Sequence, residues 1–175
     1  LGIAGFYVST IVNYMYLHNF GNIVAILLTV LISVFAAIMA RKKDSGIIKV
    51  ISFIGCYACF LPAGKTASIA EFLSMSVILL FINIFTLLLP VKRRARAVHI
   101  THLLSNMVMT IALAGIALGE EQIDVRWIVG FVVSNLIVLS LVYYFSWRKG
   151  QCSIGVFVNF LVAFAVESLY FALIL

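Results

Sequence analysis

The sequence predicts an all-α fold: a polytopic integral membrane helix bundle of six to seven transmembrane helices with short loops. Three observations predict it. Hydrophobic residues make up 65% of the 175 residues, only 10% are charged, and the mean hydropathy is +1.21, which is more apolar surface than a soluble domain of this size hides. The apolar runs are about as long as a membrane-crossing helix, roughly 20 residues. They are also continuous, whereas a lipid-exposed barrel needs alternation.

Seven apolar segments follow one another along the chain. Their predicted spans are 1–17, 22–40, 46–63, 68–90, 97–118, 126–146 and 152–175. No low-complexity linker divides the sequence, so we treat 1–175 as a single transmembrane domain. Its first and last residues lie within apolar runs, which leaves open a longer chain. No leader peptide is recognisable before the first span.

Local signals mark several span ends. The second span, 22–40, is followed directly by Arg41. Pro62 and Pro90 end the third and fourth spans, because proline lacks the N–H that a continuing helix needs. In the sixth span, Trp127 and Trp147 stand 20 residues apart. At the helical rise this is roughly 30 Å, the thickness of a bilayer core, as expected for aromatic belts at two membrane faces.

Basic residues predict the orientation. They gather after the second, fourth and sixth spans: Arg41, Lys42, Lys43, Lys92, Arg93, Arg94, Arg96, Arg148 and Lys149. The opposite turns carry fewer cations and most of the acids. Because basic loops stay in the cytoplasm, we expect these turns to be cytoplasmic, in an integral protein of the bacterial cytoplasmic (inner) membrane.

The basic turns also predict partners. Lys92, Arg93, Arg94 and Arg96, in the turn "KRRAR", are expected to contact anionic lipid headgroups. The net charge of +6 is explained by this topology, so we expect no nucleic-acid partner. Gly115 and Gly119 form a GxxxG pair that permits close helix approach, within the monomer, in a homo-oligomer or against a partner subunit.

Polar residues within the spans predict a solute site. In the last span Asn159, Glu167 and Tyr170 recur at helical spacing and share one face with Ala163. A carboxyl group at that depth is costly in a bilayer and marks a functional position.

Two further spans carry comparable polar stripes, with Asn83 in the fourth and His102, Asn106 and Thr110 in the fifth. We therefore expect a polar seam through the fourth, fifth and seventh spans, with Glu71 and Lys65 at its outer entrance. The predicted substrate-binding residues are Glu167, Asn159, Tyr170, Asn83, Asn106, Glu71 and Lys65.

The leading hypothesis is a small membrane transport protein or permease, or the membrane subunit of a transporter, that binds or moves a small solute or ion near Glu167. The first alternative is a non-transporting sensor or assembly subunit, in which amide and hydroxyl groups only join helices. The second is a thiol-disulfide oxidoreductase using Cys56 and Cys59, a CxxC pair in the third span. We favour a non-enzymatic protein.

No metal and no cofactor is expected. His99 and His102 are three residues apart, but two ligands do not close a metal site. The sequence also lacks the HExxH, GxSxG and glycine-rich phosphate-loop motifs of hydrolases and nucleotide-binding proteins.

Overall fold

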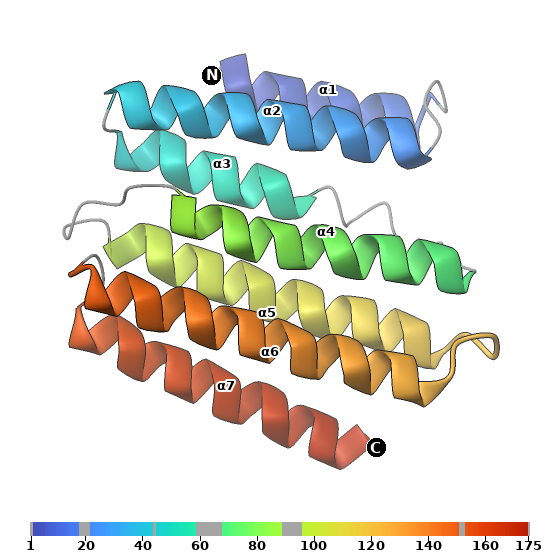
Figure 1. Cartoon of the computed structure of the whole chain (residues 1–175). Coiled ribbons are helices and arrows are strands. Elements are labelled where there is room, and N and C mark those ends of the chain that lie inside the picture. The colour runs from blue at the N-terminus through green and yellow to red at the C-terminus, as the bar shows by residue number, and fades with distance from the viewer. Residues whose placement is uncertain are drawn as a thin grey trace. The chain divides into compact units, whose positions relative to one another are not determined.

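The computed structural model describes residues 2–17, 22–43, 45–58, 68–88, 96–150 and 153–174. This described part is all-helical, 90% helix without strands, which confirms the all-α class. Its helices are α1 (Gly2–Met15), α2 (Asn22–Lys43), α3 (Gly46–Ala58), α4 (Ile69–Leu88), α5 (Arg96–Leu118), α6 (Val125–Arg148) and α7 (Ile154–Ile174) (Figure 1). Each helix lies within or close to one of the predicted spans.

The chain divides into two compact units, residues 1–65 and 66–175. Helices α1 to α3 form the first unit and α4 to α7 form the second. The single domain expected from the sequence stays a prediction, and each unit is described by itself.

In the first unit, α1, α2 and α3 all pack against one another. The Tyr7 hydroxyl lies 2.7 Å from Ser33 Oγ, and Ser33 Oγ donates to a backbone carbonyl of its own helix, so Tyr7 is the donor of the interhelical bond. The Tyr7 ring occupies the space above Gly55, where an added Cβ would overlap it. A side chain at position 55 would therefore prevent this packing.

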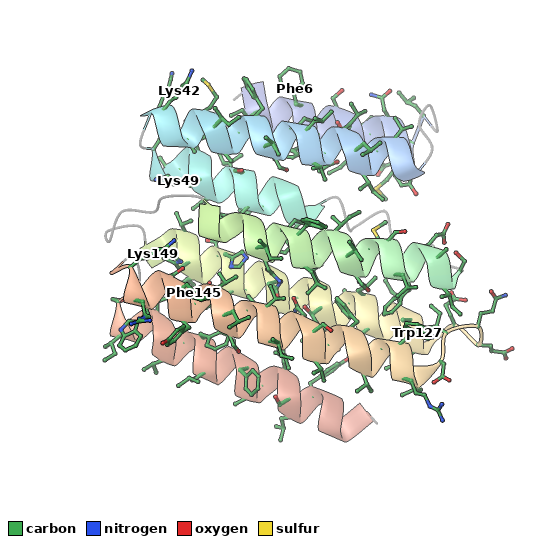
Figure 2. All side chains as sticks on the ribbon, in the orientation of Figure 1. Phe6, Lys42, Lys49, Trp127, Phe145 and Lys149 are labelled. Carbon is green, nitrogen blue, oxygen red and sulfur yellow. The ribbon has the colours of Figure 1, made fainter. Side chains whose placement is uncertain are left out.

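Basic residues of the first unit lie near the turn between α2 and α3. Lys42 and Lys49 lie at the same end of the unit (Figure 2). Lys42 is exposed, as expected for a residue of a basic turn, whereas Lys49 is buried at 4% exposure.

In the second unit, α4 packs against α6 and α5, and α7 packs against α5 and α6. One apolar cluster joins the last three helices: Leu103, Leu139, Val142, Tyr143, Val156 and Phe160. Within it, the Tyr143 and Phe160 rings stack with centroids 5.2 Å apart. In this cluster helix α7 contacts its neighbours through aromatic and aliphatic side chains.

Helix α6 has well-defined ends. The Asp124 side chain accepts from the backbone N–H of Arg126 at 2.8 Å and caps its start. Its last turn is followed by Gly150, whose φ of 67° suits glycine. Trp127 and Lys149 lie at opposite ends of the second unit (Figure 2).

Two of the described helices are long and apolar enough to cross a membrane, over Ala97–Leu118 and Val125–Arg148. The second unit buries several polar side chains and exposes large apolar ones. Asn83, Asn106 and Asn135 are fully buried, while Ile137 and Leu141 are half exposed on α6.

Candidate functional site

Three asparagines form a closed ring of amide hydrogen bonds in the second unit. Asn83 of α4 donates to Asn135 Oδ1 at 2.6 Å, Asn135 of α6 donates to Asn106 Oδ1 at 2.9 Å, and Asn106 of α5 donates to Asn83 Oδ1 at 2.8 Å. Each amide donates to the next and accepts from the previous one. The ring therefore ties three helices together at a single level.

Other polar groups extend this ring along α5. Thr110 Oγ1 accepts from Asn135 Nδ2 at 2.8 Å and donates to the carbonyl of Asn106. His102 Nε2 lies 3.1 Å from Asn83 Oδ1. Because that oxygen can only accept, His102 donates from Nε2, which sets the protonation of this ring nitrogen.

Tyr143 of α6 closes the other side of His102. Its hydroxyl lies 3.1 Å from His102 Nδ1 and also 3.1 Å from the carbonyl oxygen of His99, and its one proton can be donated to either of these acceptors. The whole network, which we call the amide core, contains Asn83, His102, Asn106, Thr110, Asn135 and Tyr143. Buried networks of this kind are stable when their members are satisfied, and interhelical hydrogen bonds are a normal means of joining apolar helices.

Glu167 of α7 differs from the amide core. Its side chain is 2% exposed, and its Oε1 has no hydrogen-bond partner among the described residues. It lines a small cavity of about 10 Å³ between α5, α6 and α7, where the other polar lining residue is Asn106. We call this the Glu167 cavity. Its volume is at the lower limit for one water molecule, roughly 10–15 Å³.

A larger hollow, the α5/α7 groove, is lined by residues of α5 and α7. Its volume is about 330 Å³, and among the described residues that line it Asn159 is the one polar residue. Leu103, Met107 and Ala163 line both the groove and the Glu167 cavity. These three residues therefore border both spaces, and we call them the wall.

The helical period explains why Asn159 and Glu167 lie in different spaces. Each step of four residues turns the helix by about 40° beyond a full turn. Asn159 faces the groove and is exposed, Ala163 is in the wall, and Glu167 faces inward. The predicted common face of α7 therefore rotates from the groove into the bundle.

The structure brings some of the predicted site residues together. Asn83 and Asn106 are hydrogen-bonded, and Asn106 and Glu167 line one cavity. Glu71, in the first turn of α4, and Tyr170 are half-buried and line neither space.

Other predicted residues fall outside the described part of the chain. These are Lys65, Lys92, Arg93, Arg94 and Cys59, together with the side chains of Arg96 and Cys56. The substrate-binding set and the lipid-headgroup set stay predictions.

Asn135 is the main residue that sequence reasoning missed. The sequence feature that could have identified Asn135 is its position as a single amide within the apolar run "FVVSNLIVL", residues 131–139. Among the described residues, no three His, Cys, Asp or Glu side chains gather as a metal site would require.

No protein-family model, no curated protein and no solved structure matches this chain.

Proposed function

We propose that the chain is a helical membrane transport protein, or the membrane subunit of a transporter, that binds a small cationic solute or ion at Glu167. The observation that carries the proposal is the carboxyl group of Glu167 beside a cavity. Glu167 is 2% exposed, and its Oε1 has no hydrogen-bond partner among the residues that the structure describes. Leaving such a group unpaired costs free energy. A bound cation would supply the missing partner.

The membrane setting of the proposal is supported by the distribution of polarity. Amides are buried and large apolar side chains are exposed in the second unit. This is the arrangement that a lipid solvent favours, since apolar side chains face the tails and polar groups pair inside. In the proposed topology seven helices cross the bacterial cytoplasmic membrane, with the basic turns in the cytoplasm.

The amide core has a structural role in this proposal. Its hydrogen bonds join α4, α5 and α6, whereas α7 contacts α5 and α6 through apolar side chains such as Val156 and Phe160. Non-directional contacts allow a helix to shift more readily than a closed hydrogen-bond ring does. Helix α7 would thus carry Glu167 between two exposures while the other three helices stay in place.

Charge displacement by the reconstituted full-length chain tests the proposal. Proteoliposomes adsorbed on a solid-supported membrane are exposed in turn to concentration jumps of H⁺, Na⁺, K⁺ and methylammonium. We expect a saturable current with at least one of these cations, lost in Glu167→Gln. The matched control is Glu121→Gln, because Glu121 is an exposed acid of the turn before α6. Equal currents in wild type and Glu167→Gln would contradict the proposal.

A non-transporting assembly subunit is the second candidate, and the closed amide ring favours it. A ring whose three amides bond one another is what helix assembly alone requires. A wild-type protein that is folded but gives no current with any of the four cations would favour this candidate.

A further inference from the structure

The α5/α7 groove and the Glu167 cavity are adjacent spaces with contrasting chemistry. The groove is about 330 Å³, at the lower end of the range for small-molecule sites. Most of its lining is aliphatic, including Leu104 and Val162, which are more than half exposed. An apolar space therefore lies beside a buried carboxyl group, one oxygen of which has no hydrogen-bond partner in the described part of the chain.

We infer that the ligand of this site is an amphipathic primary ammonium compound, with its alkyl chain in the α5/α7 groove and its ammonium group at Glu167. The inference rests on the proposed function and adds the substrate class. An aliphatic groove accepts a hydrocarbon chain, and the buried acid selects a positive charge at the end of that chain. Entry is lateral, from the lipid side of α5 and α7.

The size of the Glu167 cavity restricts the cationic group. A cavity of about 10 Å³ accepts one group of the size of a water molecule. A primary ammonium group has that size and donates three hydrogen bonds, whereas a trimethylammonium group is larger and donates none. The site should therefore distinguish these two cations even when their alkyl chains are identical.

One side chain of the wall, Met107, could move and connect the two spaces. Met107 is half-buried. Like Leu103 and Ala163, it lines both spaces. Methionine is unbranched and changes rotamer easily. Rotation of Met107 would join the groove to the Glu167 cavity without displacing a helix.

Binding of tritiated decylammonium to the full-length chain in zwitterionic lipid nanodiscs tests the inference, with empty nanodiscs as the partition background. We expect saturable binding that is lost in Glu167→Gln. Unlabelled decyltrimethylammonium and decanol should not compete. Methylammonium should compete at least roughly tenfold more weakly than decylammonium, because the buried chain contributes to binding.

Two variants of α7 test the groove itself. Ala163→Leu adds bulk at the wall, and Ala165→Leu makes the same change at an exposed position of α7 that does not line the groove. We expect Ala163→Leu to weaken decylammonium binding at least roughly tenfold and Ala165→Leu to leave it unchanged. The midpoint of detergent unfolding of both variants shows whether they remain folded.

The outcomes separate the two proposals. Methylammonium competing as well as decylammonium would keep Glu167 as a cation site but overturn the alkyl ligand. Undiminished binding in a folded Ala163→Leu protein, or equal competition by decyltrimethylammonium, would also overturn it. Absence of saturable binding overturns the ligand class, while the currents of the four small cations decide separately whether Glu167 binds cations.

Discussion

The amide core makes a quantitative prediction about Asn135. Replacing Asn135 with alanine removes three hydrogen bonds, one accepted from Asn83 and two donated to Asn106 and Thr110. Interhelical hydrogen bonds in membrane proteins are worth about 0.6 kcal/mol each on average. Asn135→Ala should therefore lower the free energy of unfolding by about 2 kcal/mol.

The closed ring also predicts how two such changes combine. Asn83→Ala removes the bonds of Asn83 to Asn135, Asn106 and His102, and it shares one bond with Asn135→Ala. The double variant should thus be more stable than additivity predicts by about 0.6 kcal/mol, the value of the shared bond.

Unfolding by sodium dodecyl sulfate in mixed micelles measures these energies. Trp127 and Trp147 both lie on α6, on either side of Asn135, so their fluorescence reports on this unit. Ser140→Ala is the control on the same helix and should change stability little, because the hydrogen bond given for Ser140 among the described residues runs within α6, to the carbonyl of Leu136 at 2.7 Å. Additive losses, or a cost for Asn135→Ala no larger than that of Ser140→Ala, would refute the account of the ring.

Two more substitutions test individual packing features. Gly55→Ala should destabilise the first unit by about 1–3 kcal/mol, because the new Cβ displaces the Tyr7 ring. The control is Gly130→Ala, because a Cβ at that position meets nothing within 4 Å. Equal thermal midpoints of the two variants would contradict the expectation. Glu167→Met should raise the free energy of unfolding by about 1–3 kcal/mol, because it removes an unpartnered carboxyl oxygen from an otherwise mostly apolar cavity. If Glu167→Met unfolds with a lower free energy than wild type in sodium dodecyl sulfate, Glu167 is paired in the folded protein.

Helix positions were accessible from the sequence because they depend on local properties. The sixth span was predicted as 126–146 and α6 covers Val125–Arg148. The agreement is close because a long apolar run bounded by an acidic turn and basic residues fixes where the helix begins and ends. The third span was predicted to reach residue 63. Helix α3 is described as far as Ala58, and residues 59–63 lie outside the described part of the chain.

Burial of individual polar residues was partly accessible as well. Asn83, Asn106 and Glu167 lie deep in apolar runs, and all three are buried. Asn159 also lies within an apolar run, but its side chain is exposed in the α5/α7 groove. Depth along a span is therefore not sufficient to decide whether a side chain faces protein.

The sequence by itself determined that the chain is helical, where its helices run and which spans carry polar groups. Only the tertiary structure decided that Asn135 completes the amide ring and that Glu167 stays outside it. The physical reason is rotation about the helix axis. Helices such as α7 carry apolar side chains on all sides, so no hydrophobic stripe specifies which face turns inward, and that face is set by packing against neighbouring helices.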